Sequence, residues 1–147
     1  MAVVRRAEVN WQGNLTAGSG RLDAVSSGAF KDLPVTWASR TEQPDGRTSP
    51  EELIASAHAS CYSMAFSSEL TKAGFPPESL SVACEIDADR VDGKFTVLAS
   101  RLTVTGRVPG IDEARFREIA AGAKEGCPIS RALKGNVQLS VDASLVR

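Results

Sequence analysis

The 147-residue sequence has no apolar run of the roughly 18–20 residues that a membrane-spanning helix requires. It also lacks a dominant charge: the formal net charge is −1, and the basic residues are scattered along the chain. No strong electrostatic field is therefore available to attract nucleic acid or anionic lipid. We expect neither a nucleic acid nor a membrane as a partner.

Residues 1–6 have charges but no long apolar stretch after them, so they do not resemble a signal peptide. We expect residence in the cytoplasm. Cysteine is scarce as well, and the three cysteines, Cys61, Cys84 and Cys127, are an odd number, which argues against a secreted disulfide framework. In a reducing compartment, a cysteine is either a small buried apolar residue or a reactive thiol.

The length suits one domain, residues 1–147, that buries a core without disulfides. Alternating apolar residues and turn signals predict strands, and helical periodicity with capping residues predicts helices. The expected order is strands at 3–12, 15–27 and 33–39, a helix at 50–72, strands at 80–91 and 95–108, helices at 112–124 and 127–133, and a strand at 137–146. This order predicts an α+β fold with mainly antiparallel pairing.

The strongest helix signal begins at Ser49. Ser49 suits the N-cap, Pro50 suits the first helical position, and Glu52 has the spacing of a capping box. Alanine and serine occur on all sides of this helix, which favours a helix covered from several directions rather than along one stripe. A single compact chain would struggle to cover a helix of about 35 Å, and an intertwined dimer would solve this.

Cys127 has the clearest local reason to be reactive. It lies between Gly126 and Pro128 at the expected start of a helix, where backbone N–H groups and the helix dipole favour a thiolate. The alternative is a cysteine packed under a loop. Cys84 alternates with Val82 and Ile86 on one face of a strand, so we expect it in the core.

Cys61 lies in the middle of the long helix, where the dipole gives no help, and its residue context favours a buried core cysteine. His58 precedes it by three residues and lies on the same helix surface. His58 either bonds to the thiol, acts as a base, or is a satisfied core histidine. A metal site of His58, Cys61 and Cys127 is a further alternative, although the spacing matches no common metal-binding pattern.

Two motifs resemble the OsmC/Ohr family, specifically its osmotically inducible OsmC branch. They are SPEELIASAHASCYSMA at 49–65 and GCPIS at 126–130. The segments 11–13 (WQG), 18–20 (GSG) and 108–111 (VPGI) agree, so the resemblance covers essentially the whole chain. It implies an OsmC-like fold, with antiparallel sheets wrapped around a long central helix, in an intertwined homodimer.

The same resemblance implies a peroxidase that reduces organic hydroperoxides, and hydrogen peroxide more weakly, without a metal, haem or other cofactor. It makes Cys61 the nucleophile that becomes a sulfenic acid, and Cys127 the thiol that resolves it as a disulfide. A dithiol or lipoyl-type reductant would then restore both thiols. Four aromatic residues are candidates for lining an apolar substrate pocket: Phe30, Trp37, Tyr62 and Phe66.

The family also places an arginine and a glutamate beside the nucleophile. The glutamate corresponds to Glu51, and the arginine to Arg40, with Arg21 as the alternative. Glu51 precedes Cys61 by ten residues, about 15 Å of helical rise, so it cannot reach that cysteine along its own helix. We therefore expect Glu51 to approach the cysteine site of the partner subunit. A non-catalytic thiol redox sensor or stress-response binding protein remains the alternative function.

Overall fold

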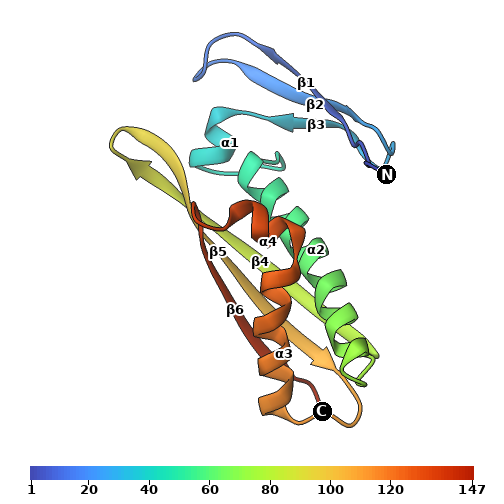
Figure 1. The fold of residues 1–147 in the computed structure, drawn as a ribbon. Helices are drawn as coiled ribbons and strands as arrows, with labels where there is room; N and C mark the ends of the chain where they lie inside the picture. The colour runs from blue at the N-terminus through green and yellow to red at the C-terminus, as the bar shows by residue number, and fades with distance from the viewer. The chain divides into compact units, whose positions relative to one another are not determined.

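The computed structural model describes all 147 residues, which form two compact units, Met1–Leu53 and Ile54–Arg147 (Figure 1). The elements are β1 (Ala7–Gln12), β2 (Ser19–Val25), β3 (Lys31–Val35), α1 (Trp37–Thr41), α2 (Pro50–Lys72), β4 (Ser79–Val91), β5 (Lys94–Arg107), α3 (Glu113–Gly126), α4 (Pro128–Leu133) and β6 (Gln138–Leu145). Helix α2 starts in the first unit and continues through the second. No helix combines the length and the apolar character of a membrane span. One domain over residues 1–147 stays a prediction.

The first unit is built on an antiparallel sheet with the strand order β1-β2-β3. Trp11 of β1 pairs with Gly20 of β2. A side chain at Gly20 would lie 2.7 Å from the Trp11 ring and 3.0 Å from Val35. Glycine at this position therefore lets the indole pack directly on the neighbouring strand.

Helix α1 is the main departure from the predicted elements. The expected strand at 33–39 ends at Val35, and Thr36 caps α1 instead. The Ser39 N–H donates to the Thr36 hydroxyl at 3.0 Å, and the Thr36 N–H donates to the Ser39 hydroxyl at 2.9 Å. This reciprocal capping box stabilises a helical turn against the strand pattern, and it places Arg40 on a helix.

The second unit contains a sheet with the strand order β4-β5-β6. Strands β4 and β5 form the predicted antiparallel hairpin, whereas β5 and β6 pair in parallel. The expected α+β fold with mainly antiparallel pairing is confirmed, and β5–β6 is its one parallel pair. The parallel pair arises because α3 and α4 form the crossover connection between β5 and β6, and such a connection returns the chain in the same direction.

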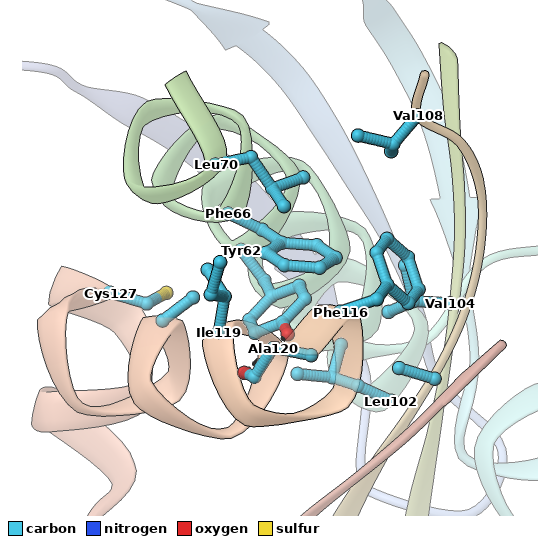
Figure 2. Close-up of a cluster of buried hydrophobic side chains, with 12 residues drawn as sticks. Tyr62, Phe66, Leu70, Leu102, Val104, Val108, Phe116, Ile119, Ala120 and Cys127 are labelled. Atoms are coloured by element: carbon cyan, nitrogen blue, oxygen red, sulfur yellow. Dashed lines mark hydrogen bonds between the residues drawn. The ribbon is translucent and has the colours of Figure 1, made fainter. Parts of the chain in front are cut away.

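Helices α2 and α3 pack with this sheet around one apolar cluster (Figure 2). Helix α2 contributes Tyr62, Phe66 and Leu70, at a spacing of four residues. Phe116 of α3 meets the Phe66 ring at a centroid distance of 5.1 Å, and the Tyr62 hydroxyl donates to the Ala120 carbonyl at 2.7 Å. Tyr62 and Phe66 are therefore fully buried core residues, and their expected role in a substrate pocket is wrong.

Within the second unit, the fully buried residues of α2 form this single stripe, and cover on its other sides stays a prediction that belongs to the expected homodimer. The fully buried residues of α2 are His58, Tyr62, Phe66 and Leu70, while Met64 on another face is 68% exposed. Only every fourth position is buried, because one sheet and one neighbouring helix can cover only one side of a helix. The expected homodimer stays a prediction.

Candidate functional site

Cys61 and Cys127 lie close together inside the second unit: Cys61 packs against the apolar cluster that contains Cys127, and each thiol shifts the pKa of the other. Cys61 comes from the middle of α2 and is half-buried, whereas Cys127 is fully buried. Figure 2 shows Cys127 at the edge of the apolar cluster. Both thiols are free in this structure. The fold thus brings together the two cysteines that the sequence analysis paired.

The junction of α3 and α4 holds Cys127 in place. Cys127 is at once the C-cap of α3 and the N-cap of α4, and Pro128 occupies the first position of α4. The Ser130 N–H lies 3.5 Å from the Cys127 sulfur. The Ile129 N–H lowers the pKa of both cysteines. The start of α4 thus supplies a backbone N–H to Cys127, as the sequence predicted.

The two cysteines titrate differently. Burial raises the pKa of the Cys127 thiol, but hydrogen bonds from the Ser130 N–H and hydroxyl, the Cys61 thiol and the Ile129 N–H outweigh it, so the net pKa is lowered. Burial also raises the pKa of Cys61; the Ile129 N–H opposes this, while the hydrogen bond and negative charge of Cys127 raise it further. These opposite directions make Cys127 the more readily ionised thiol of the pair and Cys61 the one that holds its proton more firmly.

His58 is fully buried beside this pair and does not bond to Cys61. Its Nδ1 atom lies 2.6 Å from the Ser100 hydroxyl, and its Nε2 atom lies 2.7 Å from the Ser130 hydroxyl. Burial lowers its pKa, so the imidazole is neutral. Of the predicted alternatives, the satisfied core histidine is confirmed.

Both ring nitrogens of His58 are occupied by serine hydroxyls, which leaves neither free to bind a metal with Cys61 and Cys127. The structure contains no group of three or more His, Cys, Asp or Glu side chains that could hold a metal ion. The hypothesis of a metal-binding module on these residues therefore has no structural support.

Cys84 packs against the apolar cluster, as expected, but it is also part of a polar contact. Its sulfur lies 3.2 Å from the Ser100 hydroxyl and 3.9 Å from His58 Nδ1. Burial raises the pKa of Cys84; the Ser100 hydroxyl opposes this and the charge of Glu85 adds to it. Cys84 is therefore a protonated thiol at neutral pH.

Arg40 and Glu51 form an ion pair in the first unit. The Nε and Nη2 atoms of Arg40 lie 2.9 Å and 2.7 Å from Glu51 Oε1. The second carboxylate oxygen, Oε2, is buried and has no hydrogen-bond partner within the chain. Arg21 instead donates to the Asp32 carbonyl at 3.0 Å. Of the two candidate arginines, Arg40 is therefore the one that pairs with Glu51.

The serines of the site are the residues that the sequence analysis missed. Ser130 lies inside the 126–130 motif and follows Cys127 by three residues, the spacing at which an N-cap accepts a backbone N–H. Ser100 is a fully buried polar residue on β5, the strand that also contributes Leu102 and Val104 to the core. A buried polar residue in a core strand needs a partner, and this was the available signal for Ser100.

Known proteins resemble this chain over nearly its full length. The family model described as OsmC-like protein matches residues 43–142. The chain is 37% identical to peroxiredoxin OsmC of Escherichia coli K12 over 139 residues, which cover 95% of this chain and 96% of the relative. It is 24% identical to organic hydroperoxide resistance protein OhrB of Bacillus subtilis over 135 residues, 87% of this chain and 93% of the relative.

Solved structures show the same fold. An organic hydroperoxide resistance protein OsmC from Legionella pneumophila superposes with a TM-score of 0.74 at 24% identity, covering 98% of this chain and 99% of the other. OhrB of Bacillus subtilis superposes with a TM-score of 0.73 at 22% identity, covering 95% and 98%. The likeness extends over both units of the chain.

Proposed function

This chain belongs to the OsmC-like protein family, and we propose from that membership that it is a thiol peroxidase that reduces organic hydroperoxides and, more weakly, hydrogen peroxide. The observation that carries the proposal is the proximity of Cys61 and Cys127, which pack in one cluster and shift the pKa of each other. Relatives named peroxiredoxin OsmC and organic hydroperoxide resistance protein OhrB support a peroxide as the substrate. The setting is a reducing cytoplasm that supplies thiol reductants.

The first step is attack by the Cys61 thiolate on the distal oxygen of the hydroperoxide. The Cys61 proton must leave before attack, and we assign its acceptance to the neighbouring Cys127, whose lowered pKa favours the thiolate form. The O–O bond then breaks, Cys61 becomes a sulfenic acid, and the alkoxide takes the proton back from Cys127 and leaves as an alcohol. The peroxide is reduced by two electrons and Cys61 is oxidised.

The second step is resolution by Cys127. Its restored thiolate attacks the Cys61 sulfenic acid, a disulfide forms, and hydroxide leaves and is protonated to water. A dithiol or lipoyl-type reductant then opens this disulfide by exchange and regenerates both thiols. The low pKa of Cys127 suits this role, because only the thiolate is the attacking species.

We assign the activation of the Cys61 thiol to Arg40 and Glu51. A guanidinium near the Cys61 sulfur would lower its pKa and stabilise the departing alkoxide, and Glu51 would orient that guanidinium. The ion pair and the unpartnered Oε2 atom of Glu51 support this assignment. We place the pair at the Cys61 site of the partner subunit in a homodimer, where a carboxylate that is distant along its own helix can still act.

Steady-state turnover tests the proposal. The wild-type chain should consume an alkyl hydroperoxide with a dithiol reductant faster than it consumes hydrogen peroxide. Cys61→Ser should abolish turnover, Cys127→Ser should reduce it strongly, and the matched control Cys84→Ser should retain it. A wild-type chain that is oxidised once without turnover would instead support the redox sensor, and turnover in Cys61→Ser would reject Cys61 as the nucleophile.

A further inference from the structure

A line of polar side chains runs through the second unit from Cys127 to Cys84. The Ser130 N–H lies 3.5 Å from the Cys127 sulfur, and the Ser130 hydroxyl lowers the pKa of Cys127. The further contacts are Ser130 to His58, His58 to Ser100, and Ser100 to Cys84. These residues come from the α3–α4 junction, α4, α2, β5 and β4. Ser130 is 1% exposed, and His58 and Ser100 are 0% exposed. The line is therefore shielded from water over its central three members.

With Cys127 ionised, the donors and acceptors of these side chains allow one direction of hydrogen bonding along the line. A thiolate only accepts, so when Cys127 is ionised the Ser130 hydroxyl donates to it. Ser130 Oγ then accepts from His58 Nε2–H, which leaves Nδ1 unprotonated to accept from the Ser100 hydroxyl. Ser100 Oγ in turn accepts from the Cys84 thiol. Every donor has one acceptor, and His58 is the neutral Nε2–H tautomer.

The opposite order is also complete. If Cys127 is protonated, its S–H can donate to Ser130, Ser130 to His58 Nε2, His58 Nδ1–H to Ser100, and Ser100 to Cys84. With Cys84 still protonated, the reversed order holds one proton more than the first: Cys127 carries this proton, the two serine hydroxyls turn, and the imidazole becomes the Nδ1–H tautomer. The two orders differ in whether Cys127 is an acceptor or a donor. The histidine tautomer therefore reports the protonation state of Cys127.

We propose that His58, acting through Ser130, is a positioning residue that holds Cys127 as the thiolate and thereby sets how fast it resolves an oxidised Cys61. The consequence for catalysis rests on the proposed peroxidase function. The link itself rests on the contacts at 2.6 Å and 2.7 Å on the two sides of the imidazole. A neutral imidazole held between two hydroxyls acts as a dipole and not as a counter-ion.

Other ionisable groups also face this line. Helix α2 presents Cys61 and Tyr62 towards Cys127, and burial together with the charge of Cys127 raises the pKa of Tyr62. Helix α3 carries Lys124, which is half-exposed, and Glu125, which is exposed and bonded to Lys134. Arg131 of α4 is exposed. Strand β4 contributes the protonated Cys84. None of these groups contacts the His58 ring except Cys84.

The tautomer of His58 can be read directly, because it is the single histidine of the sequence. In reduced wild-type protein, ¹⁵N chemical shifts of the imidazole at neutral pH should report the Nε2–H tautomer. In Cys127→Ala, which removes the acceptor, this preference should weaken. An Nδ1–H tautomer in the reduced wild type, or the same spectrum in both proteins, would overturn the proposal. The wild-type measurement needs no variant to fold.

Variants test the effect on Cys127. With ¹³Cβ-labelled cysteine in a Cys61→Ser background, the pKa of Cys127 should rise in Ser130→Ala and also in His58→Leu, although the latter keeps the Ser130 hydroxyl. His58→Gln, which retains a donor and an acceptor, should recover part of the effect, and the exposed control Ser140→Ala should change nothing. The acid dissociation constant of Cys127 should fall about tenfold in Ser130→Ala.

The rate at which Cys127 forms a disulfide with oxidised Cys61 should follow the pKa of Cys127. After one equivalent of alkyl hydroperoxide, Ser130→Ala and His58→Leu with both cysteines intact should form the Cys61–Cys127 disulfide more slowly at neutral pH, by up to about tenfold, with recovery at higher pH. A slowing that is the same at every pH would indicate a structural role only and overturn the proposal. The NMR titration uses no peroxide, so a failure of the proposed peroxidase function leaves this test of His58 intact.

Discussion

The pKa values of Cys61 and Cys127 shift in opposite directions because different groups surround the two sulfur atoms. Cys127 receives the N–H and hydroxyl of Ser130, while Cys61 receives one backbone N–H against burial and a neighbouring negative charge. On these contacts alone, Cys127 is the better thiolate and Cys61 the poorer one. The assignment of Cys61 as the nucleophile therefore requires an additional positive charge, for which Arg40 is the candidate.

Arg40→Ala tests this requirement. Because the pKa of Cys61 is raised in its own unit, the variant should keep Cys61 as a thiol at neutral pH and lose roughly 100-fold in turnover. The thiolate fraction rises with pH, so the activity of the variant should recover partly on the alkaline side, and its pH midpoint should lie above that of the wild type. The measurement is a pH profile of peroxide consumption.

Arg21→Ala is the matched control for Arg40→Ala. The Arg21 guanidinium bonds to the Asp32 carbonyl and not to Glu51, so this variant should keep the rate and pH midpoint of the wild type. The reverse pattern, with activity lost in Arg21→Ala and kept in Arg40→Ala, would transfer the role to Arg21.

Local rules predicted some residues of the site and not others. The N-cap position of Cys127 follows from the motif at 126–130, and the structure has the Arg40–Glu51 ion pair that the family resemblance suggested. The partners of His58 were not predictable, because Ser100 and Ser130 lie 42 and 72 residues away along the chain. Such contacts depend on which strand lies beside α2, and no local pattern encodes that.

At the scale of elements, capping residues and turn signals determined most boundaries. Helix α2 begins at the Pro50 that follows the Ser49 cap, and the Glu52 N–H donates to the Ser49 hydroxyl at 3.1 Å. Helix α1 escaped prediction because five residues are too few to show a helical period. The parallel orientation of β6 against β5 was not predictable either, because an alternating apolar pattern predicts a strand but not its direction.

Asp112→Ala tests the capping argument for α3. The Asp112 carboxylate accepts from the Arg115 N–H at 2.8 Å, and this bond would be lost. The free energy of unfolding should fall by about 1 kcal/mol in urea denaturation. Asp112→Asn, which keeps a capping oxygen, should lose less. Equal losses in the two variants would show that the cap does not stabilise α3.

At the scale of the whole molecule, the proposal assigns the two halves of the site to different subunits. Arg40 and Glu51 belong to the first unit of the chain, and the two cysteines belong to the second. The family resemblance predicts a dimer with the sites at the subunit interface. Light scattering of the purified chain should therefore give the mass of a homodimer.

Mixed dimers test which subunit supplies Glu51. Cys61→Ser and Glu51→Ala homodimers should each be inactive. If Glu51 serves the partner's Cys61, co-refolding the two variants restores one complete site in each mixed dimer. Random pairing makes half of the dimers mixed, with one of two sites intact, so turnover should reach about a quarter of the wild-type level. Mixed dimers without activity would mean that Glu51 acts within its own chain.

The most direct test of the account is to identify the sulfur that first receives oxygen from the peroxide. Cys127→Ser treated with an alkyl hydroperoxide and a sulfenic-acid trap should carry the adduct on Cys61, as read by peptide mass spectrometry. Cys61→Ser under the same conditions should carry none. An adduct on Cys127 in Cys61→Ser, with Cys61 unlabelled in Cys127→Ser, would contradict the account and make Cys127 the nucleophile.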